Sequence, residues 1–320
     1  MKRKFRLFGL IIWAECFLAT AVSTAATETQ RLKIIYSSFT GAYTPLWIAV
    51  DENLGKKYGL ALEAVYAGRA RPHQLLLSGD AQYVVSTGTG VVSSYAVGQK
   101  DLVIIASFLN VTGASLFTKP QISKPADLRG KVLGSGRPGS ITDVMLHYVL
   151  KHKLNLDPAR DVKVVPLGDG PGILPALENG VVDGTVLTTP TRLMAKAMGF
   201  REMLDFDELG IPYPYVGVST LKATVKKRPD VTVSFLRTLT EGIQIFKTNR
   251  EKSMAVMKKY LRGASDEILA ETYNYFSAKI QKTPYPSADA VRIALDMMSD
   301  QFPLAKSVDP NEVIDMSFLK

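Results

Sequence analysis

The amino-acid sequence predicts an α/β protein of two lobes with C-terminal helices, in which each lobe holds a mainly parallel sheet wrapped by helices. Two observations predict this class. Short apolar segments alternate with helix-like segments over residues 32–215, the order that builds parallel sheets with helical connections. The alternation runs through two cycles, and the second begins at residues 127–131. The 320 residues, of which 46% are hydrophobic, suffice for two domains with buried cores.

The first cycle begins with an apolar strand over residues 32–37 and a helix over residues 44–57. This helix is expected to end at Gly59, because glycine adopts the left-handed conformation of a helix C-cap. A glycine-rich turn over residues 87–90 leads into a helix over residues 91–97. The other predicted strands of this cycle lie at residues 60–66, 83–86, 102–108 and 115–118.

The second cycle repeats this order, with predicted strands at residues 132–134, 162–166 and 182–187 and a first helix over residues 141–153. Residues 213–215 are either a loop or a hinge between the lobes, and one last strand follows at residues 216–220. The remaining elements are predicted helices over residues 231–246, 250–260, 265–278 and 288–302. In the first of these helices one apolar stripe at helical spacing is formed by Phe235, Leu239, Ile243 and Phe246.

The first 25 residues are predicted to be a cleaved secretory signal peptide. A basic start precedes an apolar run over residues 7–22, and small residues follow at 23–26. A retained membrane anchor is the alternative, but the run is shorter than the ~20 residues that span a bilayer and Glu15 interrupts it. Glu15 also argues against lipidation of Cys16. Cleavage removes four basic residues and one acidic residue, which lowers the net charge from +9 to +6. We expect the mature chain in the periplasm.

The composition excludes several function classes. Cys16 is the single cysteine, so a disulfide scaffold, an iron–sulfur protein and a cysteine-ligated zinc module are excluded. His147 and His152 are five residues apart, whereas a helical zinc pair is spaced by four. The basic residues are scattered, which disfavours nucleic acid. We therefore expect no metal, no cofactor and no nucleic-acid partner.

Motifs of common enzymes are missing from the sequence. The third glycine of a dinucleotide-binding G-x-G-x-x-G would fall at Ser93, and neither a phosphate-binding G-x-x-x-x-G-K-S/T nor a G-x-S-x-G occurs. No catalytic residue is predicted, and we expect that the protein is not an enzyme.

Five loops share one character, since each follows a predicted strand, precedes a predicted helix and is rich in glycine, serine and threonine. They are residues 37–43, 68–69, 86–90, 134–142 and 188–189. In doubly wound sheets, the carboxyl ends of the strands face a crevice in which ligands bind. Glycine allows close approach of the backbone, and hydroxyls donate or accept hydrogen bonds. The loops therefore predict a polar pocket between the lobes, with ordinary helix capping as the alternative.

Five longer phrases follow one another along the chain: TGAYTPLWIAVDENLGKKYGLALE, LLLSGDAQYVVSTGTG, DLRGKVLGSGRPGS, LPALENGVVDGTVLTTP and KKRPDVTVSFLRTLTEGI. In this order the sequence resembles the nitrate/sulfonate/taurine-type substrate-binding proteins of ABC transporters, whose superfamily includes thiamine-pyrimidine-synthesis-like proteins. The resemblance covers about residues 32–300. It implies a periplasmic-binding-protein type II fold with two connecting segments. Lobe one would comprise residues 31–117 plus 216–320, and lobe two residues 118–215.

The resemblance also implies positions that contact the ligand. In lobe one these are Ser38, Phe39, Thr40, Gly41, Tyr43, Thr87, Gly88 and Thr89, and in lobe two they are Ser140, Thr142, Thr188 and Thr189. The sequence departs from the family at one position. The family usually has a Gly-x-x-Asp motif in each lobe, and in lobe one Gln82 replaces the aspartate, whereas lobe two keeps it as Asp183.

Four side chains suggest what the pocket would hold. Arg69 and Arg137 are candidate partners for an anionic group, because a guanidinium binds a carboxylate or sulfonate through two donors. Phe39, with Tyr43, would cover an apolar part of the ligand.

The implied function is that of a solute-binding protein. Such a protein would be a monomer that captures a small organic solute or anion between its lobes and delivers it to an ABC permease in the membrane. Two alternatives stay open, namely a pyrimidine-synthesis-like enzyme on the same scaffold and a ligand-sensing protein without transport.

Overall fold

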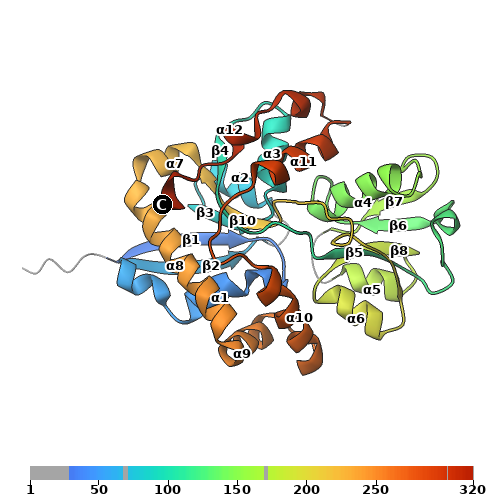
Figure 1. The fold of residues 1–320 in the computed structure, drawn as a ribbon, viewed down its shortest axis with the longest axis horizontal. Coiled ribbons are helices and arrows are strands. Elements are labelled where there is room, and N and C mark those ends of the chain that lie inside the picture. Colours follow the sequence, from blue (N-terminus) through green and yellow to red (C-terminus); the bar gives the residue numbers. More distant parts are fainter. Residues whose placement is uncertain (1–28, 68–70, 169–171, 301, 320) are drawn as a thin grey trace, which may run out of the picture.

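The computed structural model describes residues 29–67, 71–168, 172–300 and 302–319. Two five-stranded sheets, each wrapped by helices, form two lobes that lie next to each other (Figure 1). The strand orders are β2-β1-β3-β10-β4 in lobe one and β7-β6-β8-β5-β9 in lobe two. The predicted fold class is confirmed. The predicted signal peptide, residues 1–25, lies outside the described residues.

The sheet of lobe one is built mainly from apolar strands whose buried side chains form the core. Its strands are β1 (Gln30–Tyr36), β2 (Leu60–Tyr66), β3 (Tyr83–Ser86), β4 (Leu102–Leu109) and β10 (Val216–Leu221). All eight residues of β4 are buried. Strand β1 pairs in parallel with β2 and β3, and β10 pairs antiparallel with β3 and β4. At the edge of the sheet, Ile314 forms an isolated bridge with Ile104 of β4.

The sheet of lobe two includes a strand that the sequence pattern did not predict. Its strands are β5 (Ala114–Thr118), β6 (Val132–Ser135), β7 (Lys163–Pro166), β8 (Gly184–Thr188) and β9 (Arg201–Asp205). Strand β6 pairs in parallel with β7 and β8, and β5 pairs antiparallel with β8 and β9. Strand β9 was missed because this partly exposed edge strand carries Arg201, Glu202 and Asp205 instead of an apolar run.

One strand in each sheet runs against the other four. Strand β5 follows β4 of lobe one, and β10 follows β9 of lobe two. Each of these strands arrives from the opposite lobe at the carboxyl ends of the parallel strands, so it enters its new sheet in the reverse direction. The alternation of strands and helices in the sequence carries no signal for this reversal, so the sequence pattern predicts only parallel strands.

The chain passes between the lobes twice, at residues 110–113 (the first crossing segment) and at residues 206–215 (the second crossing segment). The two segments are hydrogen-bonded at their ends, because the Tyr213 and Tyr215 amides donate to the carbonyls of Asn110 and Leu109, both at 3.0 Å. A boundary after residue 117 would assign β5 to lobe one, whereas β5 pairs with strands of lobe two. We therefore propose that the first lobe boundary lies within the first crossing segment.

Helices cover both faces of the sheets (Figure 1). Lobe one has α1 (Thr44–Asp51), α2 (Pro72–Leu77), α3 (Thr89–Ala96), α7 (Lys222–Lys227), α8 (Pro229–Thr248), α9 (Arg250–Tyr260), α10 (Asp266–Lys279), α11 (Ala288–Met298) and α12 (Pro310–Val313). Lobe two has α4 (Ile141–His152), α5 (Ile173–Glu178) and α6 (Thr191–Ala197). Short 3-10 turns are η1 (Gly41–Tyr43), η2 (Leu54–Tyr58), η3 (Pro125–Leu128), η4 (Pro303–Ser307) and η5 (Ser317–Leu319). In the part of the chain that the structure describes, no helix has the length and apolar character needed to cross a bilayer.

The helix predicted over residues 44–57 is divided into two parts. Helix α1 ends at Asp51, Asn53 adopts a left-handed conformation with φ 50°, and η2 follows. Gly59 ends η2 with φ 72°, as predicted for a glycine C-cap. The predicted helix over residues 288–302 ends earlier, at Met298.

The predicted apolar stripe of α8 faces the core. The side chains of Phe235, Leu239, Ile243 and Phe246 are all buried. Helix α8 packs against α1, and Gly242 lies at the contact. A Cβ atom at Gly242 would lie only 2.3 Å from the carbonyl oxygen of Pro45, so glycine permits the close approach of these two helices.

Gln82 and Asp183 hold equivalent positions in the two lobes. The Gln82 Oε1 atom accepts a hydrogen bond from the amide of Lys33 in β1 at 2.8 Å. The Asp183 carboxylate likewise accepts from the amide of Val132 in β6 at 3.0 Å. Each side chain therefore joins the start of one parallel strand to its neighbour, and the glutamine preserves the structural role of the aspartate.

Candidate functional site

A large cavity lies between the two lobes, at the carboxyl ends of the parallel strands. Its volume is about 1550 Å³, and both lobes contribute to its wall. Nine of the predicted site residues line it: Ser38, Phe39, Tyr43, Thr87, Thr89, Arg137, Ser140, Thr142 and Thr188. The fold thus brings loops that are far apart in the sequence to one cavity. That these residues contact a ligand stays a prediction.

Of the other predicted site residues, Arg69 lies outside the described residues. Four more do not line the cavity and are buried: Thr40, Gly41, Gly88 and Thr189.

Close packing explains the two buried glycines. A Cβ atom at Gly41 would lie 2.5 Å from Cγ2 of Thr272 in α10, and a Cβ atom at Gly88 would lie 2.9 Å from Cδ1 of Ile104. Both glycines therefore admit neighbouring protein atoms, whereas the sequence argument assigned them to close approach of a ligand.

The two buried threonines join the lobes. The Thr40 hydroxyl, which follows β1 of lobe one, donates to the carbonyl oxygen of Thr189, which follows β8 of lobe two, at 2.7 Å. Both residues are almost completely buried. Within the described residues, the Thr189 hydroxyl is also buried and has no hydrogen-bond partner.

Replacing Thr40 with valine should lower the free energy of unfolding by about 1–2 kcal/mol, because the buried Thr189 carbonyl would lose its donor. Urea denaturation measures this loss. Thr238→Val is the matched control, because the buried Thr238 hydroxyl donates only to the Ser234 carbonyl within the same helix. Equal losses in the two variants would contradict a specific contribution of the contact between the lobes.

The loop after β6 carries polar groups at the amino end of α4. The hydroxyls of Ser140 and Thr142 are 3.2 Å apart, and both residues line the cavity. Asp143, which the sequence analysis missed, also lines the cavity and accepts a hydrogen bond from the Gly139 amide at 2.9 Å. Its carboxylate is 3.5 Å from Nδ1 of His147. An aspartate in the first turn of a helix is common, so its sequence position carried no functional signal.

The loops of lobe one are fixed to the second crossing segment. The Gly88 amide donates to the Pro214 carbonyl at 2.7 Å, and the hydroxyls of Thr89 and Tyr213 are 3.0 Å apart. Tyr215 lines the cavity next to these loops. Residues 213–215, expected to be either a loop or a hinge, thus lie against the loops of the predicted site, and Tyr215 is part of the cavity wall.

His73 lines the cavity from α2. Its Nε2 atom is 3.4 Å from the Ser219 hydroxyl, and its ring packs against the backbone of Gly90. Burial lowers the pKa of His73 to about 4, so the imidazole is neutral at neutral pH. His73 is therefore an uncharged part of the cavity wall. Its sequence position in a short apolar segment gave no sign of this placement.

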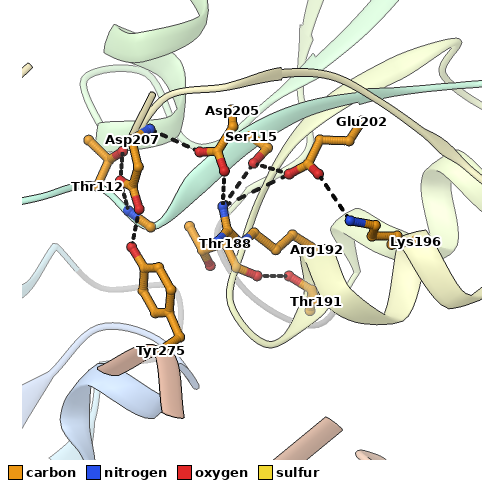
Figure 2. A network of polar contacts seen from close by, with 11 residues as sticks. Thr112, Ser115, Thr188, Thr191, Arg192, Lys196, Glu202, Asp205, Asp207 and Tyr275 are labelled. Atoms are coloured by element: carbon orange, nitrogen blue, oxygen red, sulfur yellow. Dashed lines mark hydrogen bonds and ion pairs between the residues drawn. The ribbon is translucent and has the colours of Figure 1, made fainter. Parts of the chain in front are cut away.

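A partly buried ionic network lies beside Thr188 (Figure 2). Arg192 of α6 donates to the Ser115 hydroxyl at 3.0 Å and to the Asp205 carboxylate at 3.2 Å. Glu202 is a further acidic neighbour, 3.9 Å from the guanidinium. The network ties α6 to β5 and β9, and so fixes the strand end that carries Thr188.

Asp207 extends this network to lobe one (Figure 2). Its carboxylate accepts a hydrogen bond from the Gly113 amide of the first crossing segment at 3.0 Å and another from the Tyr275 hydroxyl of α10. Burial, followed by the neighbouring carboxylate, raises the pKa of Tyr275, which keeps this phenol a donor. The two crossing segments are therefore joined to each other and to α10.

Among the described residues, no three histidine, cysteine, aspartate or glutamate side chains gather in a way that could hold a metal ion. The polar atoms of the cavity wall are mainly hydroxyls. The charged side chains in the wall are Arg71, Lys259 and Arg262 on lobe one and Arg137, Asp143 and Glu178 on lobe two. Such a wall can bind and orient a small molecule through hydrogen bonds.

Comparisons with known proteins agree with this architecture. A family model described as NMT1/THI5 like matches residues 41–253. The periplasmic aliphatic sulphonate-binding protein SsuA of Escherichia coli is similar in structure, with a TM-score of 0.72 and 20% identity over 89% of this chain and 97% of that chain. The alkanesulfonate-binding protein SsuA of Xanthomonas axonopodis pv. citri bound to MOPS has a TM-score of 0.73 and 17% identity, over 91% and 99% of the two chains.

An enzyme shares the fold as well. The desulfurization enzyme DSZB has a TM-score of 0.68 and 15% identity, over 90% of this chain and 97% of that chain. No curated protein matches the sequence. At these identities the structural likenesses show a common fold.

Proposed function

Because the chain belongs to the NMT1/THI5-like family, we propose that it is a solute-binding protein that captures a small organic solute or anion between its two lobes. The observation that carries the proposal is the 1550 Å³ cavity, whose wall combines polar loops from both lobes at the carboxyl ends of the strands. The similar sulfonate-binding proteins support the same use of the fold.

The two crossing segments are suited to a hinge between the lobes. A solute that is bound by groups of both lobes stabilises only the arrangement in which the two lobes contact it at the same time. Binding therefore shifts the population toward a closed form. A change from 1:99 to 99:1 requires about 5.5 kcal/mol of differential binding. A few hydrogen bonds to a charged group, at roughly 1.5–3 kcal/mol each, supply this difference.

The proposed ligand is an organic anion with an apolar part. Arg137 provides a cationic group in the cavity wall, suited to a sulfonate or carboxylate. Phe39 is 37% exposed, and its ring centroid lies 4.6 Å from that of Tyr66. An exposed ring supported by a second ring is a suitable surface for the apolar part of a solute.

Export and delivery complete the proposal. The predicted signal peptide and the periplasmic binding proteins that share the fold support a location in the periplasm. The chain would act there as a monomer and pass its solute to an ABC permease. An enzyme on this scaffold is the second candidate, favoured by the likeness to DSZB, and turnover of a solute by the purified protein would support it.

The processed protein should be stabilised against heat by at least one of four probes: nitrate, taurine, MOPS and biphenyl-2-sulfinate. A ligand at 100 times its Kd stabilises a fold by about 2.7 kcal/mol, which a thermal shift assay detects readily. X-ray scattering with the same probe should show a smaller radius of gyration. A protein that neither gains stability nor compacts with any probe would overturn the proposal.

A further inference from the structure

We propose that the Tyr215 hydroxyl recognises an acceptor oxygen of the bound solute and couples its binding to the contact between the lobes. This inference rests on the proposed function and adds a residue to the site.

The position of Tyr215 is the first ground. It ends the second crossing segment, where its amide donates to the Leu109 carbonyl next to the first crossing segment. Its side chain is 3% exposed and lines the cavity. Tyr215 thus lies where the lobes meet, on a backbone that both crossings fix.

The hydroxyl groups around Tyr215 come from both lobes. Its phenol interacts with the hydroxyls of Thr188, a cavity-lining residue of lobe two, and of Thr40 in lobe one. Thr40 in turn donates to the Thr189 carbonyl. A continuous series of hydroxyls therefore leads from the cavity through Tyr215 to the buried contact between the lobes. A solute that engages one end changes the hydrogen bonds available at the other.

The chemistry of the phenol defines what it recognises. Burial, and next the neighbouring Tyr43, raise the pKa of Tyr215, so the hydroxyl keeps its proton at neutral pH. A neutral phenol donates one hydrogen bond, and without a solute this proton is directed to a neighbouring threonine hydroxyl, because Thr40 gives its own proton to the Thr189 carbonyl. A solute oxygen acceptor, such as a sulfonate or carboxylate oxygen, would take the proton from that threonine, which is how binding would reach the contact between the lobes. Tyr215 thus adds a neutral donor to the cation that Arg137 places in the same cavity.

The experiment compares two buried tyrosines. Tyr215→Phe removes the hydroxyl and keeps the ring. Tyr83→Phe is the matched control, because the fully buried Tyr83 hydroxyl is 2.9 Å from the Thr232 hydroxyl and Tyr83 does not line the cavity. Calorimetry measures the Kd of whichever of nitrate, taurine, MOPS and biphenyl-2-sulfinate stabilises the wild-type protein most. Thermal unfolding of the same proteins without a probe measures the structural effect of each substitution.

Tyr215→Phe should weaken binding at least about tenfold and reduce the compaction seen by scattering, because a hydrogen bond to a charged group is lost. Tyr83→Phe should keep the Kd within about twofold, although both variants lose a buried hydroxyl contact. If Tyr215→Phe binds the probe as tightly as the wild type, or if both variants lose affinity equally, this inference is overturned and the proposed function stands. If the wild-type protein binds none of the probes, the proposed function is overturned and this inference with it.

Discussion

Lowering the pH from 7 to 4 should destabilise the fold by about 3 kcal/mol through His73 alone. Burial lowers the pKa of His73 to about 4, whereas the imidazole of an unfolded chain has a pKa of about 6.5. Between these two values the unfolded state binds the proton and the folded state does not. The contribution of neutral His73 is therefore complete above pH 6.5, and it is lost as the pH falls through 6.5 toward 4.

Urea denaturation at pH 4, 5.5 and 7.5 tests this prediction. Carboxylates also titrate toward pH 4, so the informative quantity is the difference between the wild type and His73→Gln, which should grow in favour of the variant as the pH falls. His152→Gln is the control, because His152 lies at the exposed end of α4. A parallel pH dependence of the wild type and His73→Gln would show that His73 is freely protonated in the folded protein.

Gly242→Val should lower the free energy of unfolding by about 2–3 kcal/mol. A Cβ atom at this position would lie 2.3 Å from the Pro45 carbonyl oxygen and 3.4 Å from Cβ of Ala49 in α1. The first neighbour is backbone and cannot rotate away, so α8 must move from α1 to accommodate the side chain. Glycine is a poor helix former, about 1 kcal/mol less favourable than alanine, and the close packing explains its presence in the middle of α8.

Chemical denaturation with Gly172→Ala as the control separates packing from the general effect of replacing a glycine. Gly172 has a φ of −80°, and apart from its chain neighbours no atom of the described residues lies within 4 Å of a Cβ built on it. Alanine should therefore change the stability by less than about 0.5 kcal/mol. A Gly242→Val protein as stable as the wild type would mean that the two helices separate easily at this contact.

The sequence predicted most of the fold because local patterns determine it. Alternating apolar segments located nine of the ten strands of the described chain, and the stripe of α8 located its buried face. The reverse directions of β5 and β10 have no local signal, because they follow from the passage of the chain between the lobes. Strand β9 has charged residues and is held by pairing with β5, which a local pattern cannot reveal.

The site was predicted less completely for a related reason. The loops after the strands indicated where the cavity lies, since the carboxyl ends of parallel strands converge. Which side chain of each loop faces the cavity depends on tertiary contacts, and Thr40, Gly41, Gly88 and Thr189 turn out to be buried. His73 and Tyr215 come from a helix and a crossing segment whose sequences carry no loop signature.

The position of β10 between β3 and β4 sets an order for folding. Val216 of β10 pairs with Leu109 of β4, 107 residues earlier in the chain (216 − 109), so the lobe-one sheet stays in two separate pieces until the whole of the other lobe has been synthesised. All strands of lobe two lie between residues 114 and 205, and their pairing needs no later segment. Since strand pairs that are distant in the sequence form slowly, lobe two should acquire its structure first, on the ribosome or on refolding. Strand β10 follows lobe two in the chain, so β10 becomes available to join β3 and β4 of lobe one only after lobe two is complete.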